Sequence, residues 1–514
     1  MRALKPALIF LLVVLAYLPA LGAGFVWEDD KWFSAVAVLG SQDTLRAIWQ
    51  DPFAFRETYL PLVHSSFWVE YLFWGLHPLG YHLTNVLLHA ANAVLFSLVL
   101  SQLALPGAWL AGAVFALHPV HVESVAWITE RKNVLSCLFY LLTALYFFRS
   151  TDRNKKDFYL LSIFFFLCAA LSKVAALALP LVMFLALWVK EGSLARKHLP
   201  ALVPFFLIGV LRGASAVWIE GRAVPVEADL RWSLAERLLI AGRAVWFYLG
   251  QLVWPRNLML IYPRWVVDSG SSLPFAFPLG AALAAVLLWA FRKRWGRGPL
   301  AAFLSLILVL APTLGFFSIA YYRYSFVTDH WLYHASLGPI ALTGALFAKF
   351  GARGRAAAGL VLVAFGILTW QQAAIYRDEE TLWSSSVQKN PGASIAQYNL
   401  GVALQARGKR EEALAHYEEA LRLEPKWVEV HNNMGVILTE KEEWKGAIGH
   451  LAEAVRMKPD YAAAHSNLGI ALAREGSLEE AIRHLSEAIR LDPQSLEGYL
   501  NLKTALEMRA KTKA

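Results

Sequence analysis

The sequence predicts an all-α protein in two parts, a polytopic membrane domain over residues 1–376 and a helical repeat domain over residues 377–514. Three observations support this fold class. Of the 514 residues, 57% are hydrophobic and 17% charged, whereas a soluble domain is nearer half apolar and a quarter charged. Long apolar runs fill the first part, and a fixed period runs through the polar second part. A single soluble globule and a disordered chain are therefore both excluded.

The net charge of +9 divides unevenly between the two parts. Residues 1–376 carry 30 Lys and Arg against 18 Asp and Glu, a net of +12, and residues 377–514 carry 18 against 21, a net of −3. The basic residues of the first part lie in short loops between apolar runs, which indicates membrane topology rather than a nucleic-acid partner. Both cysteines, Cys137 and Cys168, lie inside apolar runs, so no disulfide framework or cysteine metal site is predicted.

Eleven apolar runs are predicted to cross the bilayer. They cover residues 7–26, 82–103, 106–125, 133–149, 158–171, 174–189, 199–218, 276–291, 299–320, 333–349 and 356–376. Arg2 and Lys5 precede the first run and place the N-terminus in the cytoplasm; a cleaved signal peptide is the alternative. Eleven spans put the four most basic loops inside and the repeat domain outside. Residues 60–76 and 234–254 are then interfacial helices, whereas thirteen spans would put basic loops on the wrong side.

A period of 34 residues organises the second part. It is kept by Pro391, Pro425, Pro459 and Pro493, by Gly401, Gly435 and Gly469, and by Ala413, Ala447 and Ala481. Small residues where two helices touch, with Pro at the turn, are typical of tetratricopeptide repeats (TPRs). We predict a partial repeat at 378–391, repeats at 394–427, 428–461 and 462–495, and a closing helix at 496–509. Near the inner face of the first helices, amides recur that either hold an extended acceptor backbone or are only solvated: Asn399, Asn432, Asn433 and Asn467.

Three consecutive acids, Glu28, Asp29 and Asp30, follow the first span. Their mutual repulsion and their apolar neighbours predict a raised pKa for at least one of them. Such a group suits a general base or a metal site, and the alternative is a solvated helix boundary.

The outer turn at 118–133 carries His118, His121 and Glu123. Zinc is disfavoured because Pro119 interrupts the helix between the two histidines and no third ligand is spaced to fit. No metal ligand set is therefore predicted, although the acids leave a divalent cation open as a cofactor. The two histidines either bind an acceptor or stabilise a hydrogen-bonded turn.

Seven basic residues fall on the predicted outer side: Arg131, Lys132, Lys173, Arg243, Arg256, Arg264 and Arg323. This placement opposes the positive-inside tendency, so a fixed partner is expected. A lipid-linked phosphate at the outer leaflet fits that role, and snorkelling is the alternative. Our candidates for binding the phosphate are, in order, Lys173, Arg131 and Arg323, followed by Lys132.

Several segments together resemble a known family. They are FVWEDD at 25–30, YLPL at 59–62 with Ser65 and Ser66, GYHLTNVLLH at 80–89, the block at 118–133, and DHWLY at 329–333. With the trailing repeats they resemble bacterial relatives of the transmembrane and tetratricopeptide-repeat (TMTC) O-mannosyltransferases, which belong to the GT-C glycosyltransferases. The resemblance covers almost the whole chain, and the block at 118–133 is its most specific part.

The resemblance implies a GT-C-like enzyme that moves a sugar from a polyprenyl-phosphate donor to an acceptor, expected to be protein hydroxyls bound by the TPRs. The catalytic acids map to Glu28 and Asp29, or to Asp29 and Asp30, because the family usually has two Asp; Glu123 is the second-loop acid. Asn133 stands where the relatives commonly have Asp. Five further residues are assigned to acceptor binding or to structure: His118, His121, His82, Asn85 and Asp329.

The expected location is the inner membrane of a bacterium, with a cytoplasmic N-terminus and a periplasmic TPR domain. Two other functions fit the same architecture. One is a non-enzymatic TPR scaffold for envelope assembly. The other is an oligosaccharide or O-antigen ligase, which would have a large late outer loop, whereas the loop at 321–332 is short.

Overall fold

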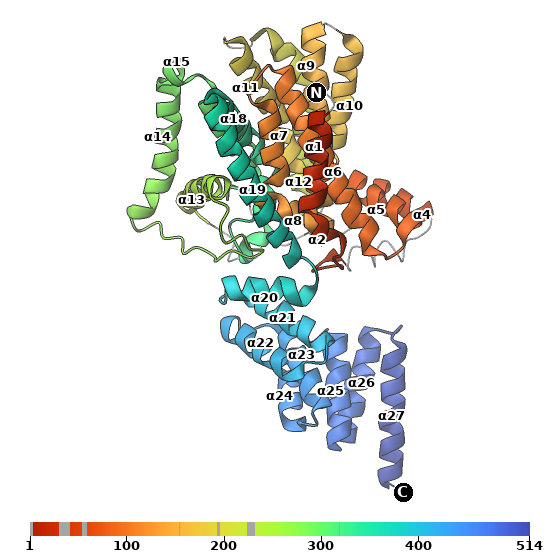
Figure 1. The fold of residues 1–514 in the computed structure, drawn as a ribbon. Helices are drawn as coiled ribbons and strands as arrows, with labels where there is room; N and C mark the ends of the chain where they lie inside the picture. The colour runs from red at the N-terminus through yellow and green to blue at the C-terminus, as the bar shows by residue number, and fades with distance from the viewer. Residues whose placement is uncertain are drawn as a thin grey trace. The chain divides into compact units, whose positions relative to one another are not determined.

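The computed structural model describes residues 4–29, 42–53, 59–153, 155–192, 196–223, 232–317 and 319–513. The described residues form helices and connecting turns without a strand, so the all-α fold class is confirmed. The chain divides into two compact units, Met1–Leu382 and Trp383–Ala514 (Figure 1). The division falls inside a helix, a few residues after the predicted domain boundary.

Six helical stretches among the described residues are long and apolar enough to cross a membrane. The helices that form them are α6 (Pro78–Gln102), α9 (Arg131–Arg153), α11 (Leu179–Glu191), α12 (Leu199–Ala223), α14 (Ala276–Ala290) and α19 (Gly351–Ile375). Four shorter apolar helices accompany them: α1 (Leu4–Ala16), α7 (Ala108–Leu117), α16 (Gly298–Leu310) and α18 (Leu337–Lys349). The remaining predicted span, 158–171, corresponds to α10 (Lys156–Ala170), which packs along α9. The count of eleven spans stays a prediction.

Two long segments between predicted spans, 27–81 and 219–275, contain helices. Residues 27–81 include α4 (Gln42–Gln50) and α5 (Pro61–Trp74), and residues 219–275 include α13 (Leu234–Val253). In Figure 1, α13 is seen nearly end-on while α14 runs vertically, so α13 lies across the direction of its neighbour. The interfacial position of the helix at 234–254 stays a prediction.

Short helices and 3₁₀ turns connect the longer ones. The short α-helices are α2 (Leu18–Leu21), α8 (Val122–Ala126), α15 (Arg292–Trp295) and α17 (Leu332–Ala335). The 3₁₀ turns are η1 (Pro119–His121), η2 (Ile128–Glu130), η3 (Val174–Ala178), η4 (Arg196–His198), η6 (Leu273–Phe275), η7 (Ala311–Thr313), η8 (Ala320–Arg323) and η9 (Asp329–Trp331). The turn at 118–133, which the sequence predicts on the outer side, is thus an alternation of η1, α8 and η2 that begins at the break introduced by Pro119.

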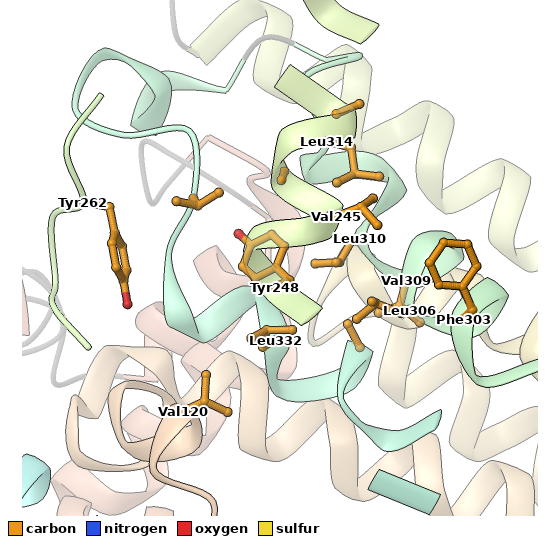
Figure 2. Close-up of a cluster of buried hydrophobic side chains, with 14 of the residues drawn as sticks. Val120, Val245, Tyr248, Tyr262, Phe303, Leu306, Val309, Leu310, Leu314 and Leu332 are labelled. Carbon is orange, nitrogen blue, oxygen red and sulfur yellow. The ribbon is translucent and has the colours of Figure 1, made fainter. Parts of the chain in front are cut away.

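A buried apolar cluster fixes the segment at 319–333 against the membrane helices. Figure 2 shows Val245 and Tyr248 of α13 beside Leu310 at the end of α16, with Leu332 and Val120 below them. Apolar side chains removed from water stabilise a fold roughly in proportion to the area buried. The cluster therefore gives α13 a second role, which is to hold a loop that carries polar residues.

The second unit is a series of antiparallel helix pairs. A single helix, α20 (Glu379–Lys389), crosses the division and is followed by α21 (Ser394–Ala406) with α22 (Arg410–Leu423), α23 (Val428–Glu440) with α24 (Trp444–Met457), α25 (Ala462–Glu475) with α26 (Leu478–Leu491), and α27 (Leu496–Lys513). The glycines that recur every 34 residues lie where the two helices of a pair touch: Gly401 faces Tyr417, Gly435 faces Leu451 and Gly469 faces Leu485.

Gly435→Ala tests this close approach. A Cβ at position 435 would meet the buried Leu451 side chain closer than Cβ atoms normally approach, so overpacking is expected to cost about 1–3 kcal/mol. Hydrogen exchange of the full chain, followed in peptides from α23 and α24, measures the effect. Gly449→Ala is the matched control, because a Cβ there meets nothing within 4 Å and a helical Gly→Ala change gains up to about 1 kcal/mol. Exchange in Gly435→Ala as slow as in the unmodified chain would contradict the packing.

Candidate functional site

The segment after the first apolar helix is bound to the segment after the last one. The backbone N–H of Gly24 donates to the carbonyl of Arg377 over 2.9 Å, and the N–H of Trp27 donates to the Glu379 carboxylate. The Trp27 and Trp127 rings stack with centroids 4.8 Å apart. Three segments that the sequence predicts on one face of the membrane therefore meet in the first unit.

Asp29 lies at this junction and is buried. Its Oδ2 accepts from the backbone N–H of Val26 and its Oδ1 from that of Thr129, each over 3.0 Å. Burial raises the pKa of Asp29 to about 7, with a smaller contribution from Glu379, while the two backbone hydrogen bonds oppose the rise. The raised pKa predicted for the acidic triplet is thus found at Asp29, but burial causes it rather than repulsion among the three acids. Glu28 is half-buried, and Asp30 lies outside the described residues.

Glu123 is also buried, and protein donors surround it. Its carboxylate accepts from Thr328 Oγ1 (3.0 and 3.2 Å), from the backbone N–H of His330 (3.1 Å) and from the His330 ring at Nδ1 (2.8 Å). A carboxylate has about four lone-pair sites, and the single Thr328 hydroxyl hydrogen, the His330 N–H and the His330 ring occupy about three of them. Glu123 therefore orients Thr328 and His330 and has little capacity left for a substrate hydroxyl.

The loop that presents Thr328 and His330 is anchored by two tyrosines. Tyr248 OH bonds the backbone of Thr328, and Tyr262 OH donates to Asp329 Oδ1 over 2.8 Å. The Tyr262 hydrogen bond thus gives Asp329 a role in positioning this loop. His330 Nε2 forms no hydrogen bond with any described residue, so that nitrogen is left for a ligand.

Glu130 gathers two of the predicted phosphate-binding cations. Lys132 Nζ lies 2.7 Å and Lys173 Nζ 3.9 Å from its carboxylate, and Asn133 links Glu130 to Lys173 through its side-chain amide. Burial lowers the pKa of Lys173 to about 8, partly offset by Glu130. The side chains of Lys132 and Lys173 are 27% and 16% exposed.

Arg131 does not lie where a donor phosphate could reach it. Its guanidinium is fully buried, forms an ion pair with Glu70 at 2.6 Å, and donates further to the Tyr81 carbonyl and to Asn85 Oδ1. The order proposed from the sequence, with Arg131 second, is therefore corrected: Arg131 ties α5 and α6 to α9. Arg323 is exposed and its guanidinium lies 5.2 Å from the Tyr324 ring centre.

The remaining predicted polar residues join segments within the unit. His82 faces the Gly24 carbonyl at 3.2 Å, and Asn85 donates to the carbonyls of Trp127 and Ile128. His118 bonds the Leu252 carbonyl and the Val120 N–H. His121 lies between the Phe115 carbonyl and Ser336 Oγ. Of the two alternatives for the histidines, these contacts favour the hydrogen-bonded turn.

Sequence reasoning missed Thr328, His330 and Glu70. A lone acid within the apolar helix at 61–74 is a signal that could have pointed to Glu70, because a charge at such a position needs a partner. Within the part of the chain that the structure describes, no three His, Cys, Asp or Glu side chains are grouped to hold a metal ion.

In the second unit, the predicted groove amides bond mainly to the protein. Asn467 donates to Asn432 Oδ1 over 2.9 Å, Asn432 donates to Asn433 Oδ1, and Asn433 donates to Tyr417 OH over 3.3 Å. Asn399 donates to the Ile395 carbonyl of its own helix. Asn433 and Asn467 remain half-buried and keep acceptor or donor capacity.

Comparisons with known proteins agree with this architecture. Tetratricopeptide repeat family models match residues 394–426 and 432–495. Protein O-mannosyl-transferase F38B6.6 of Caenorhabditis elegans is 27% identical over 81% of this chain and 62% of its own length. Protein O-mannosyl-transferase TMTC1 of Homo sapiens is 25% identical over 72% of this chain and 48% of its own, and Protein O-mannosyl-transferase tmtc2 of Xenopus laevis is 39% identical over 26% and 17%.

The chain thus spans less than two thirds of the length of these curated relatives. Among solved structures, "First TPR of Spaghetti (RPAP3) bound to HSP90 peptide SRMEEVD" covers 23% of this chain and 93% of its own at 21% identity, with a TM-score of 0.22. The similarity to the curated relatives confirms the resemblance predicted from the motifs. The chain is thus similar in sequence to protein O-mannosyl-transferases, including TMTC1 and tmtc2, and its second unit carries tetratricopeptide repeats.

Proposed function

We propose that this protein is a GT-C-type glycosyltransferase that moves a sugar from a polyprenyl-phosphate donor to protein hydroxyls on the extracytoplasmic face of the membrane. The observation that carries the proposal is that one turn, 118–133, holds Asp29 through the Thr129 N–H, pairs Glu123 with His330, and pairs Glu130 with Lys132 and Lys173. Carboxylates beside cations supply both a base for a hydroxyl and a partner for a phosphate.

Asp29 is the proposed base. The acceptor hydroxyl passes its proton to Asp29 while its oxygen attacks the anomeric carbon. The bond from that carbon to the phosphate oxygen breaks, and the polyprenyl phosphate leaves with the electron pair, so the configuration inverts. The Val26 N–H, the Thr129 N–H and the Thr129 side chain occupy about three of the four lone-pair sites of the Asp29 carboxylate, so about one is left for the acceptor hydroxyl. Since Asp29 is buried, reaction requires an opening that admits the hydroxyl to it.

Lys173 and Lys132 are the proposed partners of the leaving phosphate. Glu130 holds both ammonium groups near its carboxylate, and both lysine side chains are partly exposed, so an anion could approach this pair. Cations that are already in place when charge develops on the leaving group lower the barrier without reorganisation. Glu123 is a positioning residue in this mechanism, because His330 and Thr328 occupy its oxygens. The TPR unit is proposed to bind the acceptor polypeptide through residues such as Asn433 and Asn467.

The pKa of Asp29 sets the expected pH dependence. A base with a pKa of about 7 is protonated and inactive below that pH, so kcat/KM should rise about tenfold per pH unit and level off above about pH 7. The measurement is kcat/KM between about pH 5.5 and about pH 8.5 with the purified full chain. A flat profile across this range would contradict the assignment of Asp29 as the base.

Reconstitution tests the function itself. The full chain, purified and placed in liposomes with polyprenyl-phosphate mannose and acceptor polypeptides, is expected to add a hexose to Ser or Thr, as detected by mass spectrometry. The location is tested in the same vesicles: acceptors supplied on the side where added protease reaches the TPR unit should be modified. Absence of any transfer by a folded protein with several sugars and acceptors would favour the scaffold alternative.

A further inference from the structure

An open hollow of about 320 Å³ lies beside the proposed catalytic loop. Trp232, Trp265 and Phe326 line it with Val266 and Val267. Phe326 is buried and packs between the two indoles, 5.3 Å from the Trp232 ring and 5.9 Å from the Trp265 ring between centroids. Arg243 lies over the Trp265 ring at 4.5 Å. The aromatic wall is therefore held in place before any ligand arrives.

Two charged side chains at the hollow have unused hydrogen-bonding capacity. Glu236 caps α13, and its Oε2 accepts from the Ser233 N–H and Oγ, each over 2.7 Å. Its Oε1 has no hydrogen-bond partner among the described residues. Arg264 is exposed with its guanidinium 5.5 Å from the Phe326 ring centre, and it forms no ion pair with a described residue. The hollow thus combines flat apolar surfaces with one free acceptor and several free donors.

The hollow is joined to the catalytic loop through packed rings. Phe326 belongs to the segment that carries Thr328 and His330, and it forms a buried cluster with Ile240 and Tyr322 against which Trp331 packs. The His330 and Trp331 rings are 5.8 Å apart. A ligand in the hollow would therefore contact the segment that the proposed mechanism uses.

We propose that this hollow is a carbohydrate subsite that binds one pyranose ring. A pyranose presents a face of C–H groups, which packs on aromatic rings, and an edge of vicinal hydroxyls, which accept from a guanidinium and donate to a carboxylate. Trp232 and Trp265 supply the first surface, and Arg264 and Glu236 supply the second. The volume is at the lower end of small-molecule sites and suits a single sugar.

This inference rests on the proposed glycosyl transfer for its choice of ligand. The sugar is either the glycosyl group of the donor or a sugar already present on the acceptor. Both sources share the same pyranose chemistry, so binding is tested first with a simple glycoside, methyl α-D-mannopyranoside. Kinetic measurements then show whether the bound sugar belongs to the donor or to the acceptor.

The binding experiment is saturation-transfer NMR on the detergent-purified full chain. We expect transfer to the C–H protons of the glycoside, and binding about tenfold weaker in Trp232→Ala and in Arg264→Ala. Trp254→Ala and Arg256→Ala are matched controls from the same outer segment, because both side chains are exposed and neither lines the hollow. Asp29→Asn should keep full binding. The subsite would be overturned if the glycoside showed no saturation-transfer signal. It would also be overturned if Trp232→Ala and the unmodified chain gave equal saturation-transfer signals.

The kinetic arm separates the two sources and separates this inference from the proposed function. A raised KM for the donor in Arg264→Ala assigns the subsite to the donor sugar, and a raised KM for a glycosylated acceptor alone assigns it to the acceptor. Transfer with unchanged KM values in both variants overturns the subsite and leaves the function standing. Binding that requires Trp232, with no transfer to any acceptor, keeps the subsite and removes the transferase.

Discussion

Asp29→Asn is expected to reduce glycosyl transfer by about 10²–10⁴-fold, the usual contribution of a general base. The asparagine has nearly the same shape and still accepts one of the two backbone hydrogen bonds that hold Asp29, but it has no basic oxygen for the acceptor proton. The measurement is the rate of hexose addition by purified variant and parent in liposomes. Thermal unfolding should shift little, because removal of a buried charge offsets the loss of one accepted hydrogen bond.

This variant also separates the enzyme from the scaffold. A scaffold requires its TPR groove and not a buried carboxyl, so Asp29→Asn would leave it functional while Asn433 and Asn467 variants would not. Full transfer activity in Asp29→Asn, at normal expression and stability, would remove Asp29 as the base. Glu123→Gln is the companion, since it should disturb the position of His330 and Thr328 while leaving the Asp29 contacts intact.

Arg131→Met is expected to have the largest effect on stability, about 3–5 kcal/mol. The change leaves the Glu70 carboxylate, whose side chain is 10% exposed, without its charged partner in a buried position. It also removes donors from the Tyr81 carbonyl and from Asn85. Loss of folded protein in a fluorescence size-exclusion thermal assay of the full chain measures the effect, and the midpoint should fall by several degrees or more.

A double variant shows whether the unpaired charge is the cause. Arg131→Met with Glu70→Leu replaces both partners by apolar groups and should recover a large part of the lost stability. Arg256→Met, at an exposed arginine, is the matched control and should unfold like the parent. An unchanged midpoint in the single variant would return Arg131 to the group of residues available for a ligand.

The sequence predicted those parts of the protein in which a local pattern determines the structure. The 34-residue period predicted the helix pairs, because Gly435 and its equivalents fit only where two helices touch. Apolar runs predicted the helices of the first unit. Pairings between residues far apart in the chain could not be predicted from the sequence. Nothing in the sequence near Arg131 indicates that it pairs with Glu70, and nothing near Glu123 indicates that it bonds to His330. The hollow at Trp232 and Phe326 likewise joins segments far apart in the chain.

The contacts of Arg377 and Glu379 have a consequence for how the protein can be divided. Both residues follow the last apolar helix, yet they hold the loop that ends in Asp29. A truncation after Tyr376 would remove the repeats and would also release the backbone of Gly24 and Trp27. Loss of activity in such a truncation therefore says nothing about acceptor capture. A truncation that tests acceptor capture alone should keep the chain through Leu382, so that the segment ending in Asp29 keeps its contacts with Arg377 and Glu379.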